Sequence, residues 1–247
     1  MKKMSIEELE AAGIITNVEF TNNIEITNYT CGGYEGNENA IRDVIIPSKI
    51  NGKSVTKIDA YAFLALDSEE EIIENKLINS IVIPNSVTSI EESAFAYNEL
   101  ESVTIPKSVT AIEDYTFNGN NLESVNIPDS VTSIGEYAFA HNSLIDVVIP
   151  DNVTTIGKEA FYDCKSLETV RIGNSVTSIG EYAFMSCKSL TSIIIPKSVT
   201  SIGKNIFKEI SGPVTINYTG TQDEWNSIQI SVGLGTNYTM KYNYVIQ

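Results

Sequence analysis

The 247-residue sequence has one histidine, one tryptophan, two arginines and three cysteines. A lone histidine, His141, provides neither a histidine metal cluster nor a catalytic pair. Three cysteines without metal-ligand spacing are too few for a disulfide framework, and no phosphate-binding glycine motif occurs. No apolar run reaches the roughly 18 residues that a membrane-spanning helix needs, so we expect no membrane span. These absences predict a protein without catalytic residues, metal site or cofactor, and therefore not an enzyme.

Positive charge is also scarce in this chain. Lysine and arginine number 16 against 32 acidic residues, which gives a formal net charge of −16 at pH 7. Nucleic-acid binding needs clustered cations, so we expect no nucleic-acid partner, and an anionic membrane surface is disfavoured for the same reason. Glu7, Glu8 and Glu10 interrupt the first residues, where no signal segment for secretion is visible.

The main positive feature of the sequence is an internal repeat. The decamer SVTSIGEYAF occurs twice without change, at 130–139 and 175–184. A fixed period of 22 or 23 residues predicts a solenoid, in which each coil buries its apolar side chains against neighbouring coils. The repeated phenylalanines are Phe63, Phe95, Phe117, Phe139, Phe161, Phe184 and Phe207. The repeated prolines are Pro47, Pro84, Pro106, Pro128, Pro150 and Pro196, with Gly173 in the remaining slot.

One repeat, LESVTIPKSVTAIEDYTF at 100–117, shows how a coil is built. Leu100, Val103 and Ile105 have the spacing L-x-x-L-x-L, and their alternation with polar residues predicts one short strand per coil. Proline follows directly, and its missing N–H marks where strand pairing stops. Further apolar residues then turn inward, and the phenylalanine closes the coil from the far side.

Three other repeat positions carry small residues. The glycines at 135, 157, 180 and 203 look like turn glycines, although acidic residues in other coils show that the slot does not require positive φ. Cys164 and Cys187 share one slot in successive coils, where earlier coils have asparagine. We expect both to pack as small buried hydrophobes, with a functional thiol pair or a disulfide as the alternative. Hydrogen bonds between coils are expected from the residues after the prolines, which are Ser48, Ser86, Ser108, Ser130, Asn152, Ser175 and Ser198.

The ends of the chain and one insertion break the repeat. We expect a capping strand at 24–27 and, near the other end, a strand followed by a short helix with Trp225. The tryptophan is expected to cover the end of the core, with a sugar-stacking platform as the alternative. The insertion at about 64–76 predicts a short acidic helix with a solvated face, rather than a cation site. The single structural domain divides into an N-terminal cap, 1–40, the repeats, 41–211, and a C-terminal cap, 212–247.

The repeats resemble a known family. The pattern C-x-S-L-x-x-V/I-x-I-P-x-S-V-T-x-I-G-x-x-A-F, which runs from Cys164 to Phe184 and from Cys187 to Phe207, is similar to BspA-like leucine-rich repeats of the Treponema pallidum type. The resemblance covers roughly residues 41–228. It implies a leucine-rich repeat solenoid of about seven repeats plus caps, with a parallel β-sheet on the concave face and short turns or 3-10 segments on the convex face. It also implies a bacterial cell-surface or secreted protein involved in adhesion or host interaction, while a cytoplasmic location stays open.

A binding surface is expected on the concave face, where outward strand positions form two columns. Their small polar and β-branched residues also suit a plain scaffold, because such residues on a strand need no ligand to explain them. The column two residues before the proline slot contains Ile45, Val82, Thr104, Asn126, Val148, Arg171 and Ile194. The column four residues before it contains Asp43, Ser80, Ser102, Ser124, Asp146, Thr169 and Ser192.

Three functions are consistent with this sequence. The first is a non-catalytic protein-interaction module that binds a protein partner along the two columns. The second is a structural spacer without a ligand of its own, and the third is a cytoplasmic protein-binding scaffold. The sequence does not name the partner.

Overall fold

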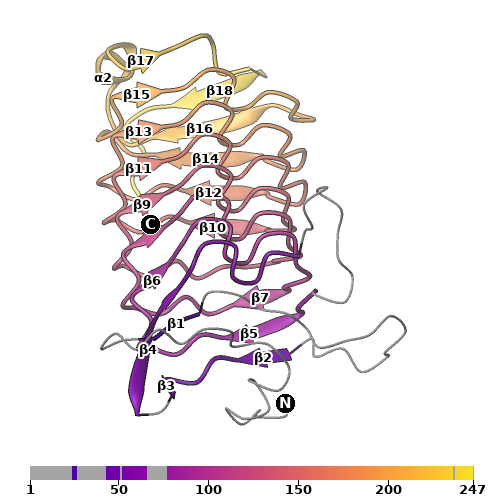
Figure 1. Ribbon diagram of the computed structural model, residues 1–247. Helices are drawn as coiled ribbons and strands as arrows, with labels where there is room; N and C mark the ends of the chain where they lie inside the picture. The colour runs from indigo at the N-terminus through magenta and orange to yellow at the C-terminus, as the bar shows by residue number, and fades with distance from the viewer. Residues whose placement is uncertain (1–23, 27–42, 51, 66–76, 236, 247) are drawn as a thin grey trace.

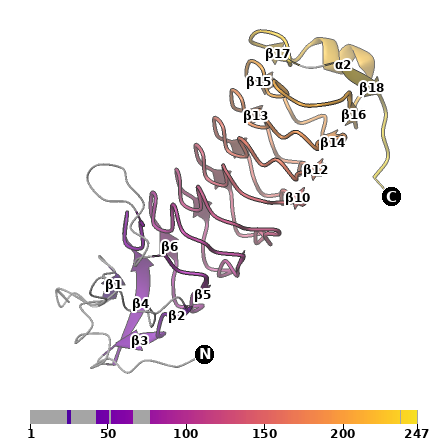
Figure 2. The same ribbon diagram turned by 90° about the vertical axis from the view of Figure 1, so that its right-hand side faces the viewer.

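The chain winds into a solenoid in which most coils contribute two short strands, so the expectation of one strand per coil was wrong (Figures 1 and 2). The computed structural model describes residues 24–26, 43–50, 52–65, 77–235 and 237–246. The two sets of strands stack parallel from coil to coil and are called here the first and second ladders. The insertion helix expected at 64–76 falls almost entirely outside the described residues, as does most of the expected N-terminal cap.

The first ladder is built from the expected L-x-x-V-x-I strands. It forms one sheet of three strands and one of five, all parallel. The strands are β2 (Asp43–Ile45), β5 (Ser80–Val82), β7 (Ser102–Val103), β10 (Asp146–Val148), β12 (Thr169–Arg171), β14 (Ser192–Ile195), β16 (Val214–Tyr218) and β18 (Tyr238–Lys241).

The second ladder comes from the segment after each proline. Most of its strands have two residues, with an isoleucine directed into the core. Its strands are β4 (Lys53–Ile58), β6 (Ser89–Ile90), β8 (Ala111–Ile112), β9 (Ser133–Ile134), β11 (Thr155–Ile156), β13 (Ser178–Ile179), β15 (Ser201–Ile202) and β17 (Gln229–Ile230). At the N-terminal end, β1 (Ile24–Ile26) pairs parallel with β4, which confirms the expected capping strand, and β3 (Lys49–Ile50) pairs antiparallel with β4.

The third side of each coil is a turn that is also hydrogen-bonded to the next coil. The N–H groups of Tyr137, Phe139 and His141 donate to backbone oxygens of the following coil at 3.0, 2.9 and 2.8 Å. Tyr137 and His141 have positive φ, at 51° and 56°, and the equivalent residues of other coils do so as well. A side chain in this left-handed conformation costs roughly 1–2 kcal/mol, so the fixed hydrogen bonds around it hold the turn in place.

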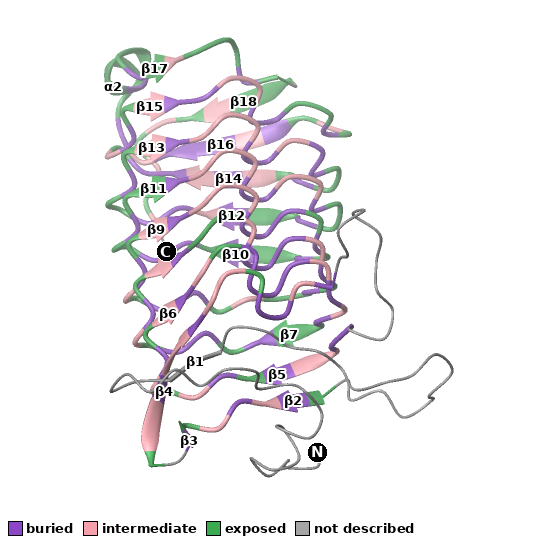
Figure 3. Ribbon diagram, in the orientation of Figure 1, coloured by how far each residue is buried: buried purple, intermediate pink, exposed green. Residues whose placement is uncertain are grey.

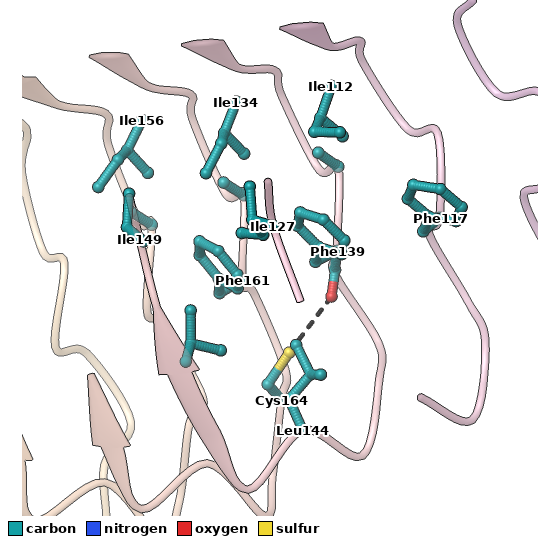
Figure 4. Packing of buried hydrophobic residues seen from close by; sticks show 14 of the residues in the cluster. Ile112, Phe117, Ile127, Ile134, Phe139, Leu144, Ile149, Ile156, Phe161 and Cys164 are labelled. Carbon is teal, nitrogen blue, oxygen red and sulfur yellow. Dashed lines mark hydrogen bonds between the residues drawn. The ribbon is translucent and has the colours of Figure 1, made fainter. Parts of the chain in front are cut away.

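The core is a continuous column between the three sides. Phenylalanine rings stack along its axis, with centroid separations of 5.6 Å for Phe117 and Phe139 and 5.5 Å for Phe139 and Phe161 (Figure 4). The rings of each pair are nearly parallel, at 12° and 11°. Each ring therefore fills the space between two neighbouring coils, which is why the phenylalanine keeps the period of the repeat.

In several coils a buried asparagine beside the phenylalanine column hydrogen-bonds to backbone groups of its own coil and of the preceding coil. Asn120 Nδ2 donates to the backbone oxygens of Phe95 and Phe117 at 2.9 and 3.1 Å, and its Oδ1 accepts from Leu100 N–H at 3.1 Å. Asn98 and Asn142 make the equivalent hydrogen bonds. Each amide satisfies backbone groups that would otherwise be buried without a partner.

The two cysteines replace this asparagine in later coils. Cys164 and Cys187 are free and fully buried, and their thiols donate to the backbone oxygens of Phe139 and Phe161 at 3.3 and 3.1 Å (Figure 4). A thiol does not replace the amide oxygen as acceptor for the leucine N–H. These coils have one extra residue, and with it Leu167 N–H donates to the backbone oxygen of Cys164 at 3.1 Å. The packing interpretation is confirmed, and the change from a 22- to a 23-residue period has a local cause.

Burial also predicts the reactivity of these thiols. It raises the pKa of Cys164 to about 12 and that of Cys187 well above its usual value. In a Cys31→Ser variant we expect neither thiol to react with Ellman's reagent within minutes at pH 8, and both to react after unfolding in guanidinium chloride. An unfolded thiol ionises near pH 8.5, so the contribution of the two buried thiols to the free energy of unfolding should be fully present below about pH 8.5. This contribution should be lost as the pH rises towards the folded pKa values. Fewer than two thiols in denaturant would instead reveal a disulfide.

The expected serine hydrogen bonds between coils are present in several places. Ser130 and Ser198 donate to the backbone oxygens of Val109 and Val176, each at 2.7 Å. Asn152 Nδ2, at the same position, donates to the Asp129 backbone oxygen at 2.6 Å. The second residue after the proline therefore joins adjacent coils at the corner between the ladders.

The C-terminal end covers the core as expected. Helix α2 (Gln222–Asn226) begins with a capping box, in which Thr221 and Glu224 each accept a backbone hydrogen bond from the other. Trp225 of this helix is buried and packs edge-on against Tyr218, with 5.1 Å between ring centroids. Because the tryptophan is buried, it is not an exposed sugar-stacking platform.

Candidate functional site

The structure stacks the two predicted columns along the outer face of the first ladder. Strand register aligns Asp146 with Thr169 and Ser192, and aligns Val148 with Arg171 and Ile194. The N-terminal coils align in the same way, with Asp43, Ser80 and Ser102 in one column and Ile45 and Val82 in the other. We call this surface the strip. Its binding role stays a prediction.

Hydrogen bonds between neighbouring coils order the polar column of the strip. The Ser80 and Thr169 hydroxyls donate to the carboxylates of Asp43 and Asp146, each at 2.5 Å. At the C-terminal end, Asn217 Nδ2 donates to Ser192 Oγ at 2.9 Å. Neighbouring side chains thus restrain one another, so the strip presents an ordered surface to solvent.

The aliphatic column supplies the exposed apolar groups of the strip. Val148 is 55% exposed and Val82 is 45% exposed, while Ile45 and Ile194 are partly buried. In Figure 3 exposed residues occur in β7, β10 and β12 of the first ladder; those of β7 and β12 are Ser102 and Thr169 of the polar column, and β10 adds Val148 of the aliphatic column. The other large exposed hydrophobics among the described residues are Tyr61, Ile145, Val232, Tyr238 and Val245.

The strip is interrupted in the coil at 122–127. This coil has no strand in the first ladder, where only an isolated bridge joins Thr104 to Asn126. Val125 is only partly buried, whereas its equivalents Val103 and Val147 are buried. Asparagine is depleted in strands, so Asn126 weakens the pairing here, although its bridge to Thr104 keeps it in the register of its column; Ser124 lies in no strand.

Two adjoining hollows lie beside this interruption. The larger has a volume of about 540 Å³ and the smaller of about 390 Å³. Residues that line the larger hollow include Asn85, Thr104, Lys107, Asn126, Asp129 and Ser130. Residues that line the smaller hollow include Asp129, Val148, Pro150, Asp151, Asn152 and Arg171. Asp129 lines both hollows, so they are neighbours, and both lie where the strip meets the repeated prolines.

The strip extends further than the sequence indicated. Thr215 and Thr239 continue the column of Ser192, and Asn217 and Lys241 continue that of Ile194. These coils lack the I-P-x-S-V-T motif that identified the others. The alternation of apolar residues in VTINY at 214–218 was the one signal that could have placed them.

Other chemically active side chains do not assemble into a site. His141 Nδ1 lies 3.2 Å from Asp163 Oδ2, at an exposed edge of the turn side, and its ring packs edge-on against Tyr162. Within the described ranges, no three or more histidine, cysteine or acidic side chains gather closely enough to hold a metal ion. The same residues contain no helix with the length and apolarity needed to cross a bilayer.

The four repeated glycines are explained by close packing rather than by turns. Gly135, Gly157, Gly180 and Gly203 do not have positive φ, so their interpretation as turn glycines was wrong. A Cβ atom on Gly180 would lie 2.5 Å from Gly157 C and from Lys158 N. Glycine is therefore needed where the backbones of adjacent coils meet.

Comparison with known proteins agrees with this architecture. A family model for the BspA type leucine rich repeat region matches in six copies, over residues 69–154 and 132–231. A leucine-rich repeat protein from Bacteroides ovatus is similar at 23% identity and a TM-score of 0.51, over 94% of this chain and 69% of that chain. One from Eubacterium ventriosum is similar at 21% identity and a TM-score of 0.52, over 90% and 68%.

A third solved structure is more distant. It is a leucine rich cell surface protein from Faecalibacterium prausnitzii, with 22% identity and a TM-score of 0.40, over 89% of this chain and 96% of that chain. No curated protein matches the sequence. At these identities the two structures from Bacteroides ovatus and Eubacterium ventriosum support the fold alone.

Proposed function

Because the chain belongs to the BspA-type leucine-rich repeat family, we propose that it is a non-catalytic protein-interaction module which binds a protein partner along the strip. The observation that carries this proposal is the exposure of Val148 and Val82 on an ordered strand surface. Strands joined coil to coil offer a preformed surface, so binding costs little conformational entropy. We further propose that this partner is met at a bacterial cell surface or after secretion, in adhesion or host interaction.

Aspartate substitutions in the aliphatic column test the strip. We expect a Val82→Asp/Val148→Asp variant to retain a partner at least tenfold less than the wild type, because docking would bury carboxylates without hydrogen-bonding partners. The measurement is quantitative pull-down by the immobilised chain from serum and from solubilised epithelial-cell surface proteins. Thermal unfolding of each variant checks that the fold is kept.

Val232→Asp is the matched control for this test. Val232 is 65% exposed and lies in a C-terminal turn outside the strip, so the same chemical change there should leave retention unaltered. Equal retention by the double variant and the wild type would refute the strip as the binding surface. Absence of any saturable partner would favour the structural spacer instead.

A further inference from the structure

The guanidinium of Arg171 has no ion-pair partner within the part of the chain that is described. Acidic residues outnumber lysine and arginine by 32 to 16, so a partly buried arginine without a carboxylate is unexpected. Arginine is fully charged at all physiological pH values and carries five N–H donors. The strip therefore carries a charged guanidinium that makes no ion pair with the described residues.

The surroundings of Arg171 leave it open on one side. Register places it between Val148 of β10 and Ile194 of β14, and its backbone oxygen accepts from Ile149 N–H at 2.8 Å. Arg171 lines the 390 Å³ hollow together with Val148 and Pro150. The backbone is thus fixed by the ladder, and Arg171 borders a recess of the size that holds one or two side chains.

Two carboxylates also line this hollow, and they differ in their bonding. Asp151 Oδ1 accepts from Asn174 N and Nδ2 at 2.9 and 3.2 Å, so it is already hydrogen-bonded to the following coil. The Asp129 side chain makes no hydrogen bond or ion pair to any described residue. The hollow is therefore lined by one arginine without an ion-pair partner among the described residues, by Asp129 without a hydrogen-bonding partner among them, and by Asp151, which stays charged within its hydrogen bonds to Asn174.

We propose that this recess, the Arg171 hollow, receives a single acidic side chain from an extended segment of the partner protein. The proposal rests on the proposed function and specifies the chemistry of its partner. A carboxylate forms two parallel hydrogen bonds with a guanidinium, and arginine is enriched among residues that dominate binding energy. Alternate side chains of an extended segment face the same way, roughly 6.6 Å apart. An aliphatic residue two positions from the acid therefore lies over Val148.

Asp129 defines the selectivity of the Arg171 hollow. A second carboxylate in the segment would be repelled by Asp129 and Asp151, which line the same hollow, and this repulsion is unfavourable. The segment that fits best has one acid flanked by aliphatic or neutral residues, rather than a run of acids. This preference separates specific docking from general attraction to a cation.

Labelled arginine gives a direct measurement, because the chain has only two arginines. In an Arg42→Lys variant grown with ¹⁵N-arginine, a single Nε–H signal reports Arg171. The probe is a capped peptide with one glutamate between two valines at alternate positions and threonine elsewhere. We expect a saturable shift of this signal, with affinity about tenfold higher than for the peptide with glutamine in place of glutamate.

Fluorescence anisotropy of the same labelled peptides measures the variants. Arg171→Gln should remove the preference for glutamate over glutamine. Lys197→Gln is the matched control, since it makes the same charge change in a coil outside the hollow and should keep the preference. Loss of the preference in Lys197→Gln would show that bulk charge is responsible and would overturn the proposal. An Arg171 signal unmoved by the glutamate peptide, or moved equally by both peptides, would overturn it too.

The two proposals fail in different ways. Partner retention that depends on Val82 and Val148 but is unchanged in Arg171→Gln would overturn the Arg171 hollow and leave the strip as the binding surface. Retention that depends on Arg171 as well supports both. Retention unchanged in every variant would remove the strip and the hollow together.

Discussion

Replacing Phe139 with alanine is expected to lower the free energy of unfolding by about 4 kcal/mol, because truncation of a buried phenylalanine removes apolar burial and leaves a cavity. Phe139 is 0% exposed and stacks on Phe117 and Phe161. The backbones on either side of the cavity are held by the hydrogen bonds of the second ladder and of the turn side, so they have little freedom to collapse into it. Urea unfolding followed by circular dichroism measures the loss.

Two controls accompany the phenylalanine variant. Phe139→Leu keeps most of the volume and should cost about 1–2 kcal/mol. Tyr238→Ala removes an aromatic ring that is 44% exposed, and should cost less than about 1 kcal/mol. A loss as small for Phe139→Ala as for Tyr238→Ala would contradict the view that the stacked rings hold the coils together.

Gly180→Ala is expected to destabilise the protein by about 3 kcal/mol, although it adds only one methyl group. The new Cβ would lie 2.5 Å from Gly157 C and Lys158 N and 2.6 Å from Gly157 O. These are backbone atoms of the preceding coil, so relief requires the two coils to separate. Overpacking of this kind typically costs about 1–3 kcal/mol, and backbone neighbours place Gly180 at the upper end. The measurement is again urea unfolding.

Gly212→Ala is the matched control, because a Cβ there would have no heavy atom within 4 Å and the residue does not have positive φ. It should be neutral, or more stable by about 0.4–1 kcal/mol through the reduced freedom of the unfolded chain. Equal stability of Gly180→Ala and the wild type would show that the coils tolerate wider spacing, and the close-packing explanation would then be wrong.

Much of the fold was predictable because each coil repeats the same solution. The period of Phe139 and its equivalents identified the solenoid, and alternation around Val103 and Val147 identified the strands of the first ladder. The second ladder was missed, because strands as short as Ser133–Ile134 contain too few residues for an alternating pattern to be recognised. Their pairing depends on neighbouring coils rather than on local preference.

The candidate site was predictable in part. Fixed strand register placed Val148, Arg171 and Ile194 in one column before any coordinates were known, as the ladder shows. The interruption at Asn126 and the two hollows were not foreseen, because they arise from imperfect pairing between particular coils. The unpaired state of Arg171 was likewise invisible, since it depends on which carboxylates come within reach after folding.

By itself, the sequence determined the repeat, the inward phenylalanines and the outward columns of the strip, because a period of 22 or 23 residues with internal alternation has few ways to bury its apolar side chains. The tertiary structure alone decided the second ladder, the need for glycine at 180 and the hollow beside Arg171. Each of these results from contact between one coil and the next, and such contacts depend on the spacing and register of whole coils, which no single segment of sequence encodes.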